Sequence, residues 1–504
     1  MSVIERNDEE IPRRLFQRWN QDTLEALGSL LAGILVISVP VVGHLLSPIF
    51  AIPVAVLLAG LVANYAPRTA VISIFVALLF QNFFVSLVSE GLSGPEEFKI
   101  IRGYNFFVLF TIWLVNTVGY ITRLRGLHKS IDKLMNATFL SMGIIFFYFA
   151  IGLAQNPTPA VIYLRNIMSP LMVFQVTLLV FWRCDFRLSA ALFLITLIFI
   201  LFGYLELLYR QEWLNLTGSK TYWDLETQKE RLLLAWDKEA RETGFVVTKF
   251  LDTITVDFFN TPLLGGLNVR VARLMGPNMH AISYSYAVAF LIIFALFRGA
   301  PLSALLLFPL LVFASAKGAL IMLILVCVAW GTFKLLGARM SFYLLCLLLI
   351  LYAISGILVG LSIGDFHVLG FMGGVHNFLQ FPLGHGIGVG GNLTTDFSKL
   401  NWPEYQALGR TPVAIESAVG VLLFQMGPGT FVVLGLYAWV AWQTIRVGSF
   451  TGTSLHVAAG FTLLTVLVNG IFQEEALFSP LALGLLISLN GMILGQAIRR
   501  GFTI

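Results

Sequence analysis

The chain has 504 residues, 58% of them hydrophobic and 12% charged, with a mean hydropathy of +0.85. About a quarter of the residues of a typical soluble domain are charged, so this composition excludes a soluble enzyme, a disordered chain, a disulfide scaffold and a nucleic-acid binder. The formal charge of +5 is of the kind that basic loops on the cytoplasmic side of a membrane protein supply.

Long apolar runs recur along the whole sequence. A helix needs about 20 predominantly apolar residues to cross a bilayer, where its backbone hydrogen bonds must be satisfied internally. The sequence therefore predicts an all-α polytopic integral membrane protein with about 12–14 transmembrane helices. The predicted spans are 24–46, 49–65, 69–88, 101–122, 134–154, 160–182, 188–209, 279–297, 300–314, 317–335, 341–361, 415–445, 455–472 and 476–497. The run 415–445 contains Gly-Pro-Gly at 427–429, which predicts a half-helix or re-entrant helix followed by a true span.

Basic residues of the short loops fall on one side of these spans. They are Arg13, Arg14, Arg18, Arg68, Arg123, Arg125, Lys129, Lys133, Arg183, Arg187, Arg298, Lys334, Arg339, Arg446, Arg499 and Arg500. The opposite connections 43–48, 154–159 and 472–478 contain no basic residue. Because Lys and Arg collect in cytoplasmic loops, we expect both termini to be cytoplasmic.

This orientation divides the chain into alternating membrane and loop regions. The predicted regions are a cytoplasmic tail at 1–22, a transmembrane bundle at 23–209, an outer loop at 210–278, transmembrane helices at 279–361, a large Gly-rich outer loop at 362–414 and C-terminal transmembrane helices at 415–504. Within the first loop, residues 223–244 are predicted to form an amphipathic helix on the membrane surface. Its apolar face would consist of Leu225, Leu232, Leu233 and Trp236.

Four ionisable residues lie where a predicted helix meets the outer side: Arg165, Arg273, Lys317 and Glu416. Ionisable groups near a bilayer are costly, so each needs a reason. Singly, each is explained by a side chain that reaches the polar interface. Together, three cations and one carboxylate on one face suit an anionic substrate from the outer leaflet, since arginine binds phosphate oxygens in a bidentate manner.

Other polar residues of the outer side have simpler explanations. His385 in the second loop is either a solvated or structural residue or a group for proton transfer. Glu474 and Glu475 fall in a short outer turn, where we expect both side chains to be solvated.

Three short blocks follow one another between residues 270 and 430. The first is Arg-x-x-Gly followed by Pro-Asn at 273–278, the second is Ser-Ala-Lys-Gly-Ala at 315–319, and the third is Pro-Leu-Gly-His-Gly-Ile-Gly at 382–388. In these blocks the chain resembles the O-antigen polymerase/ligase superfamily of polytopic glycosyltransferases, which includes Wzy-type polymerases, exopolysaccharide polymerases and O-antigen ligases. Lys317 stands where arginine is commoner in that family, and the N-terminal half matches in layout and in Arg165.

The resemblance implies a GT-C-like fold with two large periplasmic loops in the bacterial inner membrane. It implies transfer of a glycan from an undecaprenyl-diphosphate donor to a sugar hydroxyl of a second lipid-linked chain on the periplasmic side. The implied partners are these donor and acceptor lipids, the lipid bilayer, a chain-length regulator and a flippase. No cofactor, metal or nucleic acid is implied.

The ligases of this family carry His-Asn, followed eleven residues after the His by a helix break with glycine. His376-Asn377 does not fit, because Ile387 stands at that spacing, whereas Glu416 has Gly427 eleven residues later. A carboxylate in place of the imidazole favours a polymerase. A ligase that transfers glycan to lipid A core or to a protein is the alternative.

The implied mechanism gives each candidate a role. Glu416 is the expected base for the acceptor hydroxyl, since a carboxyl of raised pKa in a partly apolar site suits proton transfer. Arg165, Arg273 and Lys317 are expected to compensate the charge of the leaving diphosphate without a metal, and the attack inverts the anomeric carbon. The weaker candidate contacts are Arg270, His385, Arg410 and Ser417.

A transporter of lipid-linked oligosaccharide is the alternative from another class of protein. Many transporters are built from structural repeats with interrupted helices at matching positions in the two halves. The sequence shows no such paired halves, and its candidate charges gather at the outer edge of the membrane. Both observations favour the enzyme.

Overall fold

The computed structural model describes residues 7–185, 188–232, 254–258, 269–395 and 400–504. Ten of the described helices are long and apolar enough to cross a membrane, and three shorter apolar helices accompany them. Among the described residues the only sheet is a two-stranded pair. The chain therefore has the all-α, multi-pass architecture that its composition predicts.

The N-terminal half is a series of long helices joined by short loops. They are α1 (Asn7–Leu46), α2 (Pro48–Tyr65), α3 (Pro67–Leu87), α4 (Pro95–Arg102), α5 (Tyr104–Gly119), α6 (Lys129–Leu153), α7 (Pro157–Arg183) and α8 (Ser189–Leu208). Proline is the first residue of α2, α3, α4 and α7. This position suits proline, because the N–H that it lacks would have no partner within the helix.

The remaining elements combine further long apolar helices with several short segments. In chain order they are α9 (Arg210–Leu216), α10 (Ser219–Leu232), β1 (Thr255–Asp257), β2 (Arg270–Ala272), the 3₁₀ turn η5 (Gly276–Asn278), α13 (Ala281–Phe297), α14 (Pro301–Phe313), α15 (Lys317–Ile363), α16 (Phe366–Gln380), α17 (Trp402–Leu408), α18 (Ala418–Met426), α19 (Gly429–Thr451), α20 (Ser454–Asn469), α21 (Glu475–Phe478), the π turn η7 (Pro480–Gly484) and α22 (Leu485–Arg499). Strands β1 and β2 pair in antiparallel fashion.

Two features of the predicted spans are confirmed in detail. The predicted run 415–445 is divided, because α18 ends at Gly427, whose φ of 47° and ψ of −125° are not helical, and α19 follows. The predicted spans 317–335 and 341–361 are the two halves of α15, separated at Gly337 by a φ of 79° and a ψ of 177°. The hydroxyl of Ser341 donates to the carbonyl of Ala329, so the two halves pack against each other.

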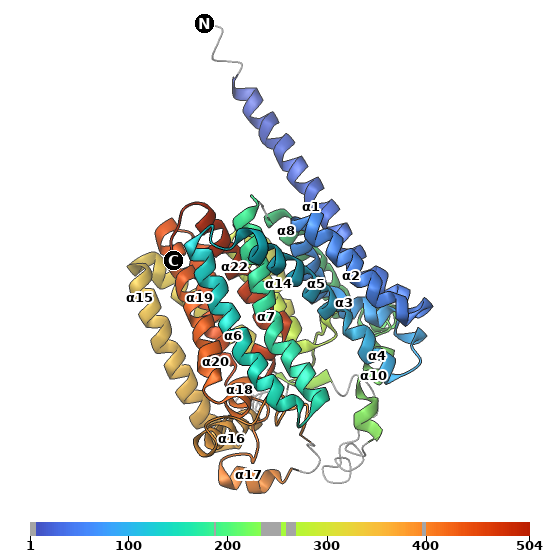
Figure 1. The fold of residues 1–504 in the computed structure, drawn as a ribbon, viewed down its shortest axis with the longest axis vertical. Coiled ribbons are helices and arrows are strands. Elements are labelled where there is room, and N and C mark those ends of the chain that lie inside the picture. The colour runs from blue at the N-terminus through green and yellow to red at the C-terminus, as the bar shows by residue number, and fades with distance from the viewer. Residues whose placement is uncertain (1–6, 186–187, 233–253, 259–268, 396–399) are drawn as a thin grey trace.

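The two ends of the bundle differ in the segments they carry. Figure 1 shows the start of α1 and the end of α22 at one end, and α10, α16 and α17 towards the other. We call the end that carries α16 and α17 the loop end. The start of α1 and the end of α22 therefore lie away from α16 and α17, and the side of the membrane that each end faces stays a prediction.

The centre of the bundle is formed by α7 and α22. These helices approach closely at two glycines of α22. A Cβ at Gly491 would lie 2.3 Å from Oγ1 of Thr177, and one at Gly495 would lie 2.5 Å from the carbonyl oxygen of Leu178. Small residues at such crossings let membrane helices pack backbone to backbone.

The predicted surface helix at 223–244 is described only in part. Helix α10 covers its beginning, whereas residues 233–253, with Leu233 and Trp236, lie outside the described residues. Helix α10 packs on α4, where the ring of Tyr222 meets the ring of Phe98 edge to face at 4.8 Å.

Candidate functional site

The turn between α20 and α21, residues 469–475, is the place where several helix starts meet. The carbonyl of Gly470 accepts a hydrogen bond from the N–H of Val419 in α18 at 3.0 Å. On the other side, Nδ2 of Asn469 donates to the carbonyl of Gly318 in α15 at 2.9 Å. The starts of α15 and α18 are therefore held against the same turn, at the loop end.

Glu416 stands at a strained corner two residues before α18. Its φ is 58°, and the other non-glycine residues with positive φ in the described part of the chain are Met279 and Ser315. These two stand at the same place before α13 and α15, and in all three cases an extended N-cap residue follows. The left-handed conformation costs an L-residue about 1–2 kcal/mol. Strain of this kind concentrates at functional sites.

Two residues distant in sequence hold Glu416 in place. Asn392 of the Gly-rich loop donates from Nδ2 to Oε1 of Glu416 at 3.2 Å and accepts its backbone N–H at 2.8 Å. His367 of α16 places Nδ1 3.0 Å from the carbonyl oxygen of Glu416 and 3.4 Å from its Oε2. The side chain of Glu416 is 26% exposed, so it combines a fixed orientation with access from outside.

The charge state of Glu416 depends on burial and on its neighbours. Burial raises the pKa of this carboxyl, the nearby charge of His367 lowers it, and the carboxylates of Glu475 and Asp365 raise it. The net direction is upward. A half-buried carboxyl of raised pKa is a suitable group for accepting a proton near neutral pH.

Lys317 is the first residue of α15 and is half-buried. Its side chain has no hydrogen bond or ion pair with the residues that the structure describes. A cation at this position adds to the positive end of the helix dipole. The start of α15 is therefore a favourable place for an anion.

Arg273 reaches the same region from the segment after β2. Its Nε donates to the carbonyl of Ala314, at the end of α14, at 3.0 Å. Burial lowers the pKa of Arg273, and the charge of Glu475, in the turn 469–475, opposes that effect. Within the described part of the chain, the two Nη atoms of Arg273 make no hydrogen bond. Arg273 thus joins Lys317 and Glu416 around one turn.

Arg165 is the predicted site residue that the contacts do not join to this group. It lies in α7, where its Nε donates to Oδ1 of Asn166 at 3.4 Å. The positive charge of Arg102 in α4 repels that of Arg165. Tyr163, two residues earlier and about 200° around the helix, does reach the turn 469–475. A role of Arg165 beside Glu416 stays a prediction.

Glu474 is buried, so the expectation that it is solvated was wrong. Its side chain accepts a hydrogen bond from the hydroxyl of Tyr163 at 2.8 Å, and the residue is 8% exposed. The other carboxyl oxygen, Oε2, is buried without a hydrogen-bond partner among the described residues. Burial raises the pKa of Glu474 to about 8, with the neighbouring carboxylates of Glu475 and Glu416 adding to the effect. This carboxyl is therefore held in its neutral form near neutral pH.

Two of the weaker candidate contacts have structural roles. Ser417 is the N-cap of α18: its hydroxyl accepts the N–H of Gly420 at 3.1 Å and donates to the carbonyl of Gly470 at 3.3 Å. Arg410 contacts the ring of His376, with 2.9 Å between Nη1 and Nδ1. None of these contacts leads directly to Glu416.

The other two weaker candidates lie at the edges of the site. Arg270 is an exposed residue of β2 whose Cα lies opposite that of Asp257 in β1. The ring of His385 stacks on that of Phe424 at 4.4 Å, and burial lowers its pKa, which favours the neutral ring. His385 therefore acts here as a packing residue.

The Gly-rich block of the second loop threads between helices. Its glycines have positive φ throughout: Gly384, Gly386, Gly388, Gly390 and Gly391. A Cβ at Gly388 would lie 2.4 Å from the backbone nitrogen of Ala160 in α7, and one at Gly391 would lie 2.1 Å from the hydroxyl of Tyr163. The glycines thus supply both a left-handed backbone and close approach, and so place Asn392 beside Glu416.

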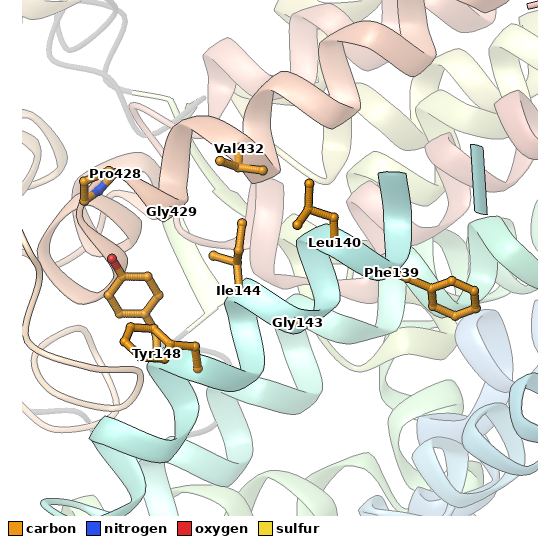
Figure 2. Close-up of a pocket in the computed structure, with 9 residues that line it drawn as sticks. Phe139, Leu140, Gly143, Ile144, Tyr148, Pro428, Gly429 and Val432 are labelled. Atoms are coloured by element: carbon orange, nitrogen blue, oxygen red, sulfur yellow. The ribbon is translucent and has the colours of Figure 1, made fainter. Parts of the chain in front are cut away.

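An apolar groove opens between α6 and α19, beside the break that follows α18. Figure 2 shows Leu140 and Ile144 of α6 facing Val432 of α19, with Pro428 at one end. The groove has a volume of about 570 Å³. At the Pro428 end lies Tyr148, whose carbonyl accepts the N–H of the loop residue at 387 at 3.0 Å. The groove therefore ends at the Gly-rich loop.

Residues suited to metal binding do not gather in the part of the chain that the structure describes: no three His, Cys, Asp or Glu side chains there could hold an ion. No protein-family model, curated protein or solved structure matches the chain.

Proposed function

We propose that this chain is a membrane glycosyltransferase that polymerises oligosaccharide repeat units carried on undecaprenyl diphosphate. The observation that carries the proposal is the gathering of Arg273, Lys317 and Glu416 around the turn 469–475. A proton acceptor and two cations, on segments that meet at one turn, offer what the transfer requires, namely a base for the acceptor and charge for the leaving group. The motifs at 273–278, 315–319 and 382–388 point to the same activity through their family resemblance.

The reaction can be written with these groups. A hydroxyl of the acceptor sugar gives its proton to Glu416 while its oxygen forms a bond to the anomeric carbon of the donor. The bond from that carbon to the diphosphate oxygen breaks, and the electron pair leaves with undecaprenyl diphosphate. Arg273 and Lys317 stabilise the added negative charge, and attack from the opposite face inverts the anomeric carbon.

His367 and Asn392 orient and tune the base in this proposal. Asn392 holds Oε1 of Glu416, which leaves Oε2 to the substrate and to His367. The charge of His367 limits the rise in the pKa of Glu416 that burial causes. The carboxyl is then ionised, and able to accept a proton, over a wider range of pH.

The groove of Figure 2 suits the lipid part of the substrate. Its lining is almost wholly apolar, it lies on two membrane helices, and it ends at the loop that carries Asn392. An isoprenoid chain in this groove would bring its diphosphate to the loop end. In this proposal the loop end faces the periplasm of a bacterial inner membrane and both chain termini are cytoplasmic.

The test is polymer formation by the purified protein in detergent, with lipid-linked repeat units as the only substrate. We expect products of higher mass from the wild type. A Glu416→Gln variant should lose about 100-fold or more of this activity, the range typical of a missing general base. The matched control is Glu404→Gln on exposed α17, where the new side chain can still accept the hydrogen bond from Asn401.

The alternatives predict other results in the same preparation. Full activity of Glu416→Gln would remove Glu416 from the reaction. Transfer only when lipid A core or a protein acceptor is added would identify a ligase. Movement of lipid-linked oligosaccharide across a vesicle membrane, with no product of higher mass, would identify a transporter.

A further inference from the structure

Glu206 and Arg210 form hydrogen bonds with the backbone of the segment that carries Arg273. Glu206, near the end of α8, is 1% exposed and accepts the N–H of Met275 at 2.9 Å and the N–H of Gly276 at 2.7 Å, one on each carboxyl oxygen. A buried carboxylate needs such charged hydrogen bonds to offset its lost hydration. These two also satisfy the backbone at the start of η5.

Arg210 holds the same segment from its other side. It begins α9, four positions after Glu206, and its guanidinium donates to the carbonyls of Ala272 at 3.0 Å and Arg273 at 3.4 Å. The opposite charges of Glu206 and Arg210 also act on each other. Arg210 therefore fixes the two carbonyls before Leu274, and Glu206 fixes the two N–H groups after it.

The middle of the segment is fixed as well. The N–H of Leu274 donates to the carbonyl of Phe313 at 3.1 Å. Gly276 has a φ of 57°, and a Cβ there would lie 2.2 Å from the ring of Tyr284, so the segment fits closely against α13. With its backbone held and its Nε bound to Ala314, Arg273 has a defined position, and its Nη atoms face no partner among the described residues.

We propose that Glu206 and Arg210 are positioning residues that hold residues 272–276 so that Arg273 presents its guanidinium to the substrate diphosphate. This inference rests on the proposed function. Neither residue touches the substrate in this arrangement, and both act through Arg273. A bidentate contact with phosphate depends strongly on the direction of the guanidinium, so a small shift of this segment weakens binding.

The test is a double-mutant cycle on the full-length protein, read as the dissociation constant for undecaprenyl diphosphate in detergent. Glu206→Gln places a donor against an N–H group, and Arg210→Lys loses the fork that reaches two carbonyls. We expect each variant to weaken binding about tenfold in the wild-type background, since a misplacement of about 1 Å costs up to about 100-fold. In an Arg273→Ala background neither should weaken binding further.

The control is Glu212→Gln, an exposed residue of α9, which should bind as the wild type does. Equal effects of Glu206→Gln and Arg210→Lys in both backgrounds would show a role in stability alone and overturn the inference, as would unchanged binding in both variants. If Glu206→Gln fails to fold, the Arg210→Lys arm decides alone. A wild-type protein that binds no undecaprenyl diphosphate would overturn the proposed function together with this inference.

Discussion

Tyr163 of α7 donates a hydrogen bond to Oε1 of Glu474 over 2.8 Å, across 311 positions of the chain. Its hydroxyl also lies directly under the backbone of Gly391, where a Cβ would come within 2.1 Å. One hydroxyl therefore connects the central helix, the Gly-rich loop and the turn 469–475. Asn392, the residue after Gly391, in turn donates a hydrogen bond to Glu416.

The neutral state of Glu474 makes stability depend on pH. An ordinary glutamate loses its proton near pH 4.5, whereas burial holds the pKa of Glu474 at about 8. Between these values the folded protein binds the proton that the unfolded chain has lost, so stability falls as pH rises through this window. Glu474→Gln is neutral at every pH and should lack this fall.

The measurement is the midpoint of thermal unfolding in detergent at pH 5 and pH 8.5. We expect Glu474→Gln to gain on the wild type by several degrees at the higher pH, since about 1 kcal/mol corresponds to a few degrees for a large domain. The exposed Glu90→Gln variant serves as the control. The same difference from wild type at both pH values would contradict a buried, neutral Glu474.

His367 should set the acid limb of the activity profile. The charge of His367 lowers the pKa of Glu416, so its removal in His367→Ala raises that pKa. The ionised base then appears only at higher pH, and the acid limb of kcat/KM should move upward. His456→Ala, at the start of α20, is the control, because its Nδ1 contacts Thr451 and not Glu416. An unchanged acid limb in His367→Ala would show that this histidine does not affect the pKa of the proposed base.

Gly388 is expected to tolerate no side chain. Its φ is 89°, and a Cβ would lie 2.4 Å from the backbone nitrogen of Ala160, which cannot move aside. Gly409 has a similar φ of 67°, but the nearest atom to a Cβ there, from Leu361, is 3.8 Å away. Gly409→Ala should therefore cost only the left-handed conformation, about 1 kcal/mol.

Gly388→Ala should lose several kcal/mol, in the range of severe single substitutions, and accumulate poorly. The comparison of abundance and unfolding midpoint between the two variants separates close packing from backbone conformation. Equal losses in both would mean that the loop does not pack tightly on α7.

A substitution at Gly143 tests whether the groove binds the lipid chain of the substrate. This residue lines the groove of Figure 2, and a Cβ there meets nothing within 4 Å, so Gly143→Trp fills the space without a backbone clash. We expect KM to rise several-fold for a substrate with a long isoprenoid chain and to stay the same for a short-chain analogue. Gly435→Trp in α19 also has open space and does not line the groove, so it is the matched control. Equal effects on long and short chains would exclude the groove as the lipid site.

The sequence predicts the membrane helices well, because apolar length and helix breakers are local properties. The break at 427–429 and the division of α15 both follow from such signals. The residues around Glu416 were harder to find. His367 lies nine positions before the His376-Asn377 pair, and no local pattern connects it to a carboxylate 49 positions away.

Glu474 shows the same limit from the other side. Two adjacent carboxylates in a short turn suggest a solvated surface, and only the packing of α7 against this turn reveals that Glu474 is buried. The composition of the turn is a signal for burial, since the residues from Phe472 to Phe478 are otherwise largely apolar. Arg273 and Lys317 stand out as ionisable residues at the ends of predicted helices and lie in short motifs, whereas Glu206 and Arg210 act on backbone groups and belong to no motif.

At Glu416 a left-handed backbone lowers the stability of the fold, while the carboxyl is needed for the proposed reaction. A glycine there would relieve the unfavourable backbone and the buried carboxyl at once. We expect Glu416→Gly to unfold no earlier than the wild type while making no polymer, and Ser315→Gly, at the equivalent corner, to relieve the same backbone. Early unfolding of Glu416→Gly would mean that the carboxyl holds the corner together. Otherwise the protein keeps, just before α18, a residue that its architecture does not need.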